Sequence, residues 1–220
     1  MASDLLRNVA FVWLRRGMWR TDVRAGRLRP ARFFDLVIEP GDLAQQADRG
    51  VTAGSGDAQL VSPISMLEAI DPLPRAEARR RLGLQAEGKV ALLTLGSGRL
   101  GDVTGPGQVA AETLLAETDW KIAVTRSPIA RNKVPVEAAD RFVEIRNQYP
   151  LAKYLNAFDV AISSADYNAV HELIPAGLAT LLVANSSTGT DDQRAHAHHL
   201  ASVALAPPPM TMTLKAFAAS

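Results

Sequence analysis

From residue 89 onward, short apolar runs alternate with amphipathic stretches, and this pattern constrains the fold more than any other feature of the chain. Apolar runs of this length are typical of strands buried on both faces, and the stretches between them repeat their apolar residues at helical spacing. Strands are predicted at residues 89–95, 120–125, 142–145, 158–163 and 179–184, and helices at 76–81, 108–117, 151–157, 167–176 and after Asp192. This alternation indicates an α/β fold, a Rossmann-like doubly wound parallel sheet.

Polar residues gather at two consecutive strand-to-helix junctions in residues 158–200. Ser164 and Asp166 follow one predicted strand and can cap the next helix, and the polar loop 185–192 follows the next strand. Junctions of this kind place free backbone N–H groups at one edge of a parallel sheet, where phosphates bind. The sequence therefore predicts a nucleotide site at this edge.

Composition bounds the function classes. The 220 residues are 47% hydrophobic and can bury a core, and the net charge of +1 favours no nucleic-acid partner. The absence of cysteine excludes disulfides and thiolate chemistry and fits a reducing cytoplasm. No apolar stretch reaches the roughly 20 residues that span a bilayer, so a cytoplasmic location is expected.

The N-terminal segment is locally basic. Aromatic residues lie among its arginines, so the segment is a candidate for contact with an anionic lipid surface or an acidic acceptor. The alternative is a buried strand at 9–14 surrounded by solvated arginines, with a second strand at 33–38 and a Gly/Ser/Pro-rich linker at 48–65. In residues 1–32 the basic residues are Arg7, Arg15, Arg16, Arg20, Arg24, Arg27, Arg29 and Arg32, against Asp4 and Asp22.

A glycine pattern follows the strand at 89–95. Gly96, Gly98 and Gly101 match G-x-G-x-x-G, which favours a dinucleotide fold and, as an alternative function, an NADPH-dependent oxidoreductase. Residues 102–107 separate the third glycine from the expected helix, and Arg126 stands where an acidic ribose ligand is expected. Arg126 would suit a 2′-phosphate instead.

A second set of residues resembles a known family. The residues are Ser164-Ala165-Asp166, Glu172 followed by Pro175-Ala176-Gly177-Leu178, the buried run 179–184, Asp192-Gln193 and His196-Ala197. Over roughly residues 76–205 they resemble the donor-binding half of GT-B glycosyltransferases, in particular the glycosyltransferase family 28 C-terminal domain of enzymes similar to the peptidoglycan N-acetylglucosaminyltransferase. His196 stands where that family usually has Asn.

The resemblance implies a UDP-sugar site. It implies donor-phosphate contacts from Gly96, Ser97, Gly98, Tyr167, Asn168 and Ala169, a ribose contact from Glu172, base contacts from Arg126, Gln148 and Tyr149, and sugar contacts from Asp192, Gln193 and His196. The expected reaction is hexosyl transfer, with N-acetylglucosamine as one candidate sugar, to an acceptor hydroxyl with inversion and without a cofactor or metal.

The resemblance also implies an organisation. Residues 75–220 are expected to be the nucleotide-sugar-binding domain, incomplete at its C-terminus, and residues 1–74 a remnant of the acceptor-side domain plus a linker. Because no general base stands out in 1–74, alternatives are a non-catalytic UDP-sugar-binding subunit with an acceptor-domain or membrane-bound partner, or a sugar-nucleotide epimerase. A peripheral position at the inner face of the membrane is expected for such a pair.

The histidines do not have the spacing of metal ligands. His171, His196, His198 and His199 contain no H-E-x-x-H motif, and H-x-H-H places successive residues on different helical faces. These side chains are therefore expected to be exposed or to face a partner, and no metal site is predicted.

Overall fold

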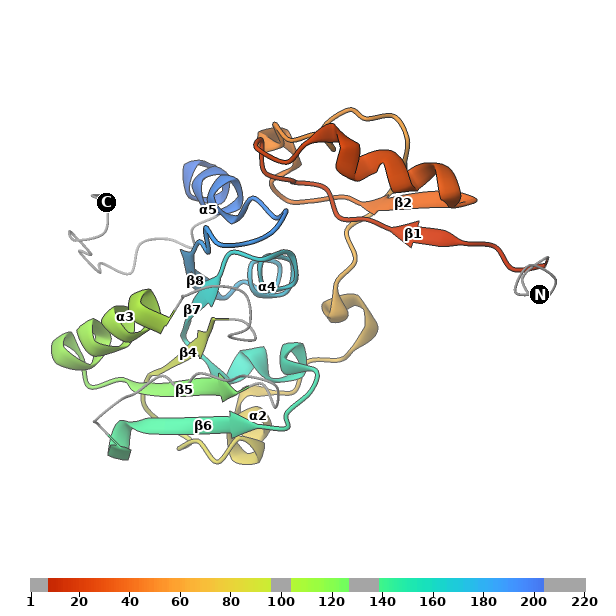
Figure 1. Ribbon diagram of the computed structural model, residues 1–220. Helices are drawn as coiled ribbons and strands as arrows, with labels where there is room; N and C mark the ends of the chain where they lie inside the picture. Colours follow the sequence, from red (N-terminus) through yellow and green to blue (C-terminus); the bar gives the residue numbers. More distant parts are fainter. Residues whose placement is uncertain (1–7, 96–103, 127–138, 204–220) are drawn as a thin grey trace, which may run out of the picture.

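The computed structural model of the chain describes residues 8–95, 104–126 and 139–203, which contain two parallel sheets (Figure 1). The N-terminal elements are β1 (Val12–Leu14), η1 (Ala25–Phe33), β2 (Leu36–Pro40), η2 (Gln45–Ala47), β3 (Gln59–Val61) and η3 (Met66–Ala69). The remaining elements are α2 (Arg75–Arg81), β4 (Val90–Thr94), α3 (Thr104–Glu117), β5 (Lys121–Arg126), η4 (Ala139–Arg141), β6 (Phe142–Arg146), η5 (Leu151–Ala157), β7 (Val160–Ser164), α4 (Tyr167–Leu173), β8 (Ala179–Val183) and α5 (Gln193–Ser202).

The larger sheet has the order β6-β5-β4-β7-β8, and all its neighbouring strands are parallel. The chain enters at the central strand β4, builds outward to β6, then returns to β7 on the other side of β4 and ends at β8. This is a doubly wound, Rossmann-like topology. The predicted α/β fold class is confirmed.

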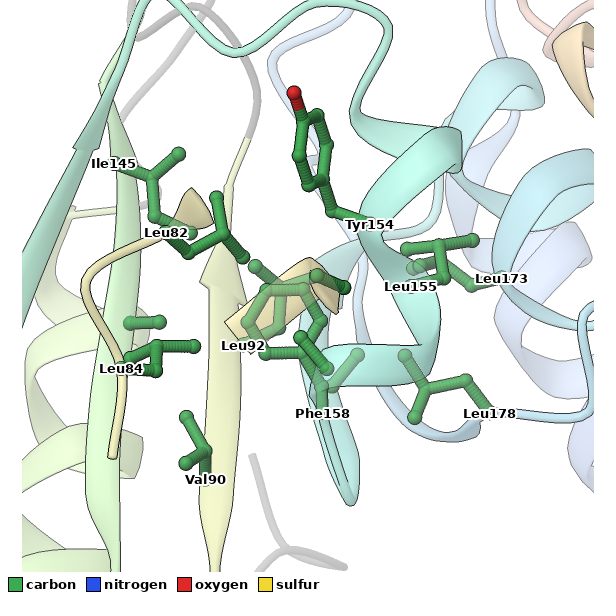
Figure 2. Packing of buried hydrophobic residues seen from close by; sticks show 14 of the residues in the cluster. Leu82, Leu84, Val90, Leu92, Ile145, Tyr154, Leu155, Phe158, Leu173 and Leu178 are labelled. Atoms are coloured by element: carbon green, nitrogen blue, oxygen red, sulfur yellow. The ribbon is translucent and has the colours of Figure 1, made fainter. Parts of the chain in front are cut away.

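Both faces of this sheet are covered by hydrophobic clusters. On one face Leu92 and Ile145 pack with Leu155 of η5 and Leu173 of α4 (Figure 2). On the opposite face, Leu93, Ile122 and Ile162 pack with Leu114 and Leu115 of α3. Burying one such leucine or isoleucine contributes roughly 1.5–3 kcal/mol, so these clusters hold the five strands in place. The uninterrupted apolar runs of the sequence follow from this burial on both faces.

A buried arginine fixes α2 at the amino ends of the strands. Arg79 is 1% exposed and donates hydrogen bonds to the carbonyls of Ala157, Ala86 and Gly88. It also pairs with Asp159 at 3.2 Å, and this carboxylate accepts the N–H of Val90. The charge is compensated, as burial requires.

The smaller sheet has the order β1-β2-β3 and is also parallel. The predicted burial of the first strand is wrong, because Val12 is 48% and Leu14 is 58% exposed on an edge strand. The linker predicted at 48–65 is wrong in part, because residues 59–61 form β3. This strand is short and carries a polar residue, and its pairing with β2, Ile38 opposite Gln59, defines it.

The prediction that the N-terminal arginines are solvated is wrong for Arg15. It is 2% exposed and donates to Glu39 at 2.9 Å and to Asp57 at 2.8 Å. The hydrogen bond from Arg15 lowers the pKa of Asp57 to about 2, whereas burial raises the pKa of Glu39 despite the same partner. This ion cluster joins β1, β2 and the loop before β3.

Several element boundaries differ from the sequence prediction. The helix predicted at 108–117 begins already at Thr104, because Pro106 is tolerated in a first helical turn. Residues 151–157 form a 3-10 helix, and α4 ends at Leu173, followed by a turn in which Gly177 has φ +73°. None of the helices in the described ranges is long and apolar enough to span a bilayer.

Candidate functional site

The five strands of the larger sheet run in one direction, so the loops that follow them lie along one edge (Figure 1). At this edge β4 and β7 are neighbours from opposite halves of the fold, with Thr94 opposite Ser163. Ligands of doubly wound sheets bind in the crevice at this change of direction. The carboxyl ends of β4 and β7 therefore define the candidate site.

The predicted residues after β4, β5 and β6 are only partly described. Gly96, Ser97, Gly98 and Gly101 lie outside the described residues, but β4 ends at Thr94, beside the end of β7.

Arg126 is the last residue of β5, and Gln148 and Tyr149 follow β6 at the outer end of the edge. Tyr149 is 83% exposed. The predicted base-binding residues thus lie at the same edge as the crevice, Arg126 one strand from β4 and Gln148 and Tyr149 two strands from it.

The start of α4 is capped internally. Asp166 accepts the N–H of Ala169 at 3.1 Å, so this N–H is already engaged. Tyr167 is 4% exposed, and its hydroxyl donates to the carbonyl of Gly41 and accepts the N–H of Ile64. Of the three predicted phosphate contacts on this helix, only Asn168 is exposed.

Glu172 is a partly buried carboxylate without a compensating partner. It makes no hydrogen bond or ion pair within the described residues, and burial raises its pKa, with a further contribution from the nearby carboxylate of Asp166. Asp166, whose charge acts on Glu172, is the cap of α4. A desolvated carboxylate with open acceptor positions is suited to hydroxyl donors.

The loop between β8 and α5 uses its polar side chains internally. Asp192 caps α5 by accepting the N–H of Ala195 at 3.0 Å. Gln193 is 6% exposed, accepts the N–H of Asn185 and donates to Asp191. The predicted sugar-binding pair is therefore at the same edge, but both side chains already have partners.

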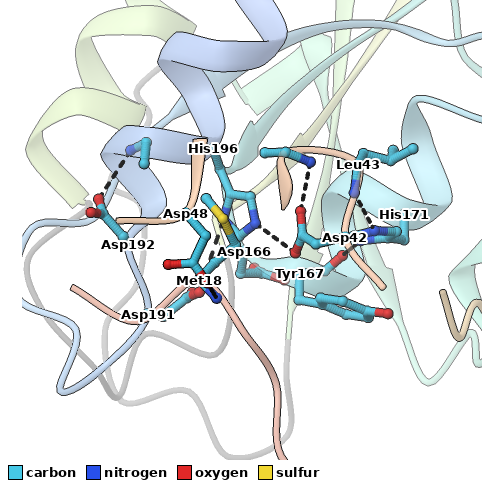
Figure 3. Close-up of polar contacts among 12 residues, drawn as sticks. Met18, Asp42, Leu43, Asp48, Asp166, Tyr167, His171, Asp191, Asp192 and His196 are labelled. Carbon is cyan, nitrogen blue, oxygen red and sulfur yellow. Dashed lines mark hydrogen bonds and ion pairs between the residues drawn. The ribbon is translucent and has the colours of Figure 1, made fainter. Parts of the chain in front are cut away.

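His196 joins α5 to the N-terminal part of the chain (Figure 3). It is completely buried, and its Nε2 lies 2.8 Å from Oδ2 of Asp42, in the loop after β2. Its Nδ1 has no hydrogen-bond partner in the described part of the chain and lies 3.9 Å from Oδ1 of Asp191.

The electrostatics of this pair favour the charged forms. Burial alone would lower the pKa of His196, but Asp42 and Asp191 outweigh it and the pKa is raised. Burial would raise the pKa of Asp42, but the hydrogen bond to His196 outweighs it and the pKa is lowered. Burial raises the pKa of Asp191.

His171 makes a second connection to the same N-terminal loop. Its Nε2 accepts the N–H of Leu43 at 3.1 Å, and its Nδ1 lies 2.7 Å from the carbonyl of Tyr167, so the proton belongs on Nδ1. The ring stacks on Tyr167 with centroids 4.0 Å apart. The expectation of exposed histidines is wrong for His171 and His196, which are 2% and 0% exposed.

Backbone contacts also tie the N-terminal segment to the β8–α5 loop. The carbonyl of Met18 accepts the N–H of Asp192 at 2.8 Å, and the N–H of Arg20 donates to Thr190 at 2.6 Å. Trp19 forms an antiparallel bridge with Asp191. The segment 18–20 therefore lies directly against the loop that carries the predicted sugar-binding residues.

Sequence analysis missed Asp42 as a site residue. The available signal was its position directly after a predicted strand and turn, because polar residues at the carboxyl ends of parallel strands commonly line sites. Within the described ranges, no group of three or more His, Asp or Glu side chains is arranged to hold a metal ion.

Solved structures with a similar fold are glycosyltransferases. No protein-family model and no curated protein matches the sequence. The glycosyltransferase of kitacinnamycin matches with a TM-score of 0.51 at 15% identity, over 92% of this chain and 64% of that one.

Two further matches are MurG of Acinetobacter baumannii (TM-score 0.48, 17% identity, 90% of this chain and 53% of that one) and SnogD of Streptomyces nogalater (TM-score 0.44, 17% identity, 80% and 62%). The chain is thus structurally similar to GT-B glycosyltransferases, and at these identities the similarity concerns the fold. It spans between half and two thirds of the length of these proteins.

Proposed function

We propose that this chain binds a UDP-sugar at the carboxyl edge of the larger sheet and supplies the donor-binding part of an inverting hexosyltransferase of the family 28 type. Residues 75–220 form the donor domain in this proposal, and residues 1–74 belong to the acceptor side. N-acetylglucosamine is a candidate sugar. No cofactor or metal is invoked.

The observation that carries the proposal is Glu172. Burying an ionised carboxylate without a partner is unfavourable, so such a group calls for an explanation. It belongs to α4, the helix that follows β7, and doubly wound folds bind nucleotides where the carboxyl ends of β4 and β7 are neighbours. A carboxylate in this position can accept both ribose hydroxyls, which would replace the missing hydrogen bonds.

The dimensions of the edge fit an extended donor. Neighbouring strands are about 4.8 Å apart, so the carboxyl ends of β6 and β8 are roughly 19 Å apart across four spacings. In the proposal the base lies toward Gln148 and Tyr149 after β6, and Arg126 contacts the base or phosphate rim. The ribose and diphosphate lie between β4 and β7, and the sugar lies toward α5.

The diphosphate would be held largely by backbone groups. Gly96, Ser97 and Gly98 are assigned to it, together with the N–H groups of Tyr167 and Asn168 at the start of α4. Preorganised N–H donors stabilise the charge that develops on a leaving diphosphate. Ala169 contributes little, because its N–H is engaged by Asp166.

The side chains proposed to contact the sugar already have hydrogen-bond partners within the protein. Asp192 and Gln193 have internal partners, and His196 is paired with Asp42. Sugar contacts from these side chains require that the donor exchange with these hydrogen bonds. Substitution of Gln193 is therefore expected to affect the loop as well as sugar selectivity.

Calorimetric titration tests the proposal. Wild-type protein is titrated with UDP, UMP, UDP-N-acetylglucosamine and UDP-glucose. The proposal expects binding of UDP, a weaker response to UMP, which lacks the second phosphate, and discrimination between the two sugars. Absence of heat with every ligand up to millimolar concentration would contradict it.

A second candidate is a non-catalytic UDP-sugar-binding subunit that works with a partner. The observation that favours it is that Asp42, the buried carboxylate of the N-terminal part at this site, is engaged by His196 and is not free as a general base. This candidate expects UDP-sugar binding without release of UDP in the presence of acceptor alcohols. Release of UDP would favour the complete transferase.

A further inference from the structure

A basic cavity of about 510 Å³ lies between the segment before η1 and the loop between β8 and α5. It is an open pocket, because Arg24, Gly26 and Arg27 are exposed. The lining residues used below are three arginines, one carboxylate and two glycines: Arg20, Arg24, Arg27, Asp22, Gly26 and Gly189.

The only carboxylate among these six residues is already neutralised. Asp22 accepts two hydrogen bonds from Arg20, at 3.0 Å from Nε and 2.6 Å from a terminal nitrogen. Neither Arg24 nor Arg27 forms an ion pair with a carboxylate in the described ranges. Among the residues that the structure describes, the positive charges of Arg24 and Arg27 are therefore uncompensated.

Arg20 is also fixed to the opposite wall. Its other terminal nitrogen donates to the carbonyls of Ser186 at 2.8 Å and Thr188 at 3.2 Å, in the β8–α5 loop. The two walls are thus joined at the position of Arg20. A rigid wall lowers the entropic cost of binding a ligand.

The 3-10 geometry of η1 brings Arg24 and Arg27 together. Arg24 caps η1, and the N–H of Arg27 donates to the carbonyl of Arg24 at 3.0 Å. In a 3-10 helix, residues three apart lie above one another on the same side. Arg29 and Arg32 have the same spacing on the row of η1 that begins at Gly26, and neither lines the cavity.

We propose that this cavity binds a phosphate or diphosphate group of a molecule other than the nucleotide donor. Paired guanidinium groups are the side chains best suited to phosphate oxygens, through charge-assisted and bidentate hydrogen bonds. At Gly189 no side chain of the described residues lies within 4 Å of the position that a Cβ would take. That the phosphate belongs to the glycosyl acceptor rests on the proposed function, whereas phosphate binding itself does not.

The cavity is placed so that an acceptor could use it. Gly189 belongs to the loop that carries Asp191 and Asp192, and the charge of Asp192 acts on Arg20. A phosphate bound here would lie near the proposed sugar end of the donor, and not at the neighbouring carboxyl ends of β4 and β7. An anionic group held on this side would direct its attached alcohol toward the donor sugar.

The test is a calorimetric titration in which inorganic pyrophosphate is added to the protein. The protein is first saturated with UDP. The variant Arg24→Gln/Arg27→Gln removes two charges that line the cavity, and the control Arg29→Gln/Arg32→Gln removes the same number of charges from residues of η1 that do not line it. We expect the first variant to bind pyrophosphate at least about tenfold more weakly than wild type and the control to bind within about twofold of wild type.

Two results would overturn the inference: equal weakening in both variants, which indicates nonspecific attraction, and no binding of pyrophosphate to wild type. Vesicles of phosphatidic acid and phosphatidylcholine in equal parts, compared with phosphatidylcholine alone, identify the source of the phosphate. Vesicle binding that depends on Arg24 and Arg27 indicates a lipid headgroup, and pyrophosphate binding alone indicates a soluble phosphate ester.

A second measurement does not depend on the variants. Pyrophosphate should protect Arg24 and Arg27 of wild type from modification by phenylglyoxal, as read by mass spectrometry, and leave Arg29 reactive. Uniform reactivity with and without pyrophosphate would overturn the inference. Because Glu172 does not line the cavity, Glu172→Gln should bind pyrophosphate as wild type does, which separates this site from the donor site.

Discussion

The fold does not stabilise the ionised form of the Glu172 carboxylate. Burial and the nearby Asp166 raise its pKa, so the ionised form is less stable in the folded than in the unfolded chain. The stability associated with this group is therefore present at pH below its ordinary value of 4.5 and is lost as the pH rises through the raised pKa. A hydroxyl group of a ligand that donates a hydrogen bond to Glu172 would stabilise its ionised form.

Replacing Glu172 by Gln should therefore stabilise the unliganded protein at neutral pH. Since solvent reaches part of the side chain, we expect a gain of only about 0.5 kcal/mol, or an increase in Tm of roughly 1–2 °C. The gain should disappear at pH below 4.5. Thermal unfolding followed by circular dichroism at both pH values checks this, and a loss of stability at neutral pH would show that Glu172 has a structural partner.

The Asp42–His196 pair makes the opposite contribution. His196 has a raised pKa, so its stabilisation is present below pH 6.5 and is lost as the pH rises through the raised value. Asp42 has a lowered pKa, so its stabilisation is present above pH 3.8 and is lost as the pH falls through the lowered value. The pair is strongest between these limits.

His196→Ala should lower the free energy of unfolding by about 3 kcal/mol in this window, because it removes the charged partner of the buried Asp42 and leaves it only the N–H of Ala44. His198→Ala, on an exposed position of the same helix, should change it by less than about 0.5 kcal/mol. Urea unfolding in the window and again at alkaline pH measures both. An equal loss for His196→Ala at both pH values would show that the cost is the cavity and not the charge.

At the scale of elements, Arg15 holds the smaller sheet together. Arg15→Met leaves the buried Glu39 without its cation, so we expect β1, β2 and β3 to open about 3 kcal/mol more easily, which corresponds to roughly hundredfold faster amide exchange. Hydrogen–deuterium exchange with mass spectrometry should show this in β1–β3 and not in β4–β8. The exposed Arg29→Met serves as the control.

Unchanged exchange in β1–β3 of Arg15→Met would show that the ion cluster is dispensable. Faster exchange that extends through β4–β8 would show that the two sheets unfold as one unit.

The strands of the larger sheet were predictable, because burial on both faces leaves continuous apolar runs such as residues 89–95 and 179–184. The strand β3 was not, because Gln59–Val61 is short and is defined by pairing with β2. The 3-10 form of residues 151–157 was also missed, because apolar spacing does not separate it from an α-helix over two turns.

The candidate site was predictable only in part. Loops after parallel strands lie at one edge by the rules of the fold, so the positions of Asp166 and Asp192 follow from the pattern. The pattern does not show which polar side chains form hydrogen bonds with one another. Asp42 and His196 are 154 positions apart, and no local signal in the chain connects them.

At the scale of the whole molecule, the two sheets are covered differently. The larger sheet has hydrophobic clusters on both faces, whereas the smaller sheet leaves Val12, Leu14 and Leu36 exposed. Parallel sheets are usually covered on both faces. The chain spans 53–64% of the length of the similar glycosyltransferase structures.

We propose that Glu172 binds the ribose of a UDP group near the neighbouring carboxyl ends of β4 and β7. The most direct test is a cycle of four calorimetric titrations, in which UDP and 2′,3′-dideoxyuridine diphosphate each bind wild type and Glu172→Gln, with the distant Glu117→Gln as control. We predict that Glu172→Gln weakens UDP binding at least about tenfold and leaves binding of the dideoxy analogue unchanged. Equal affinity of wild type and Glu172→Gln for UDP would contradict the account.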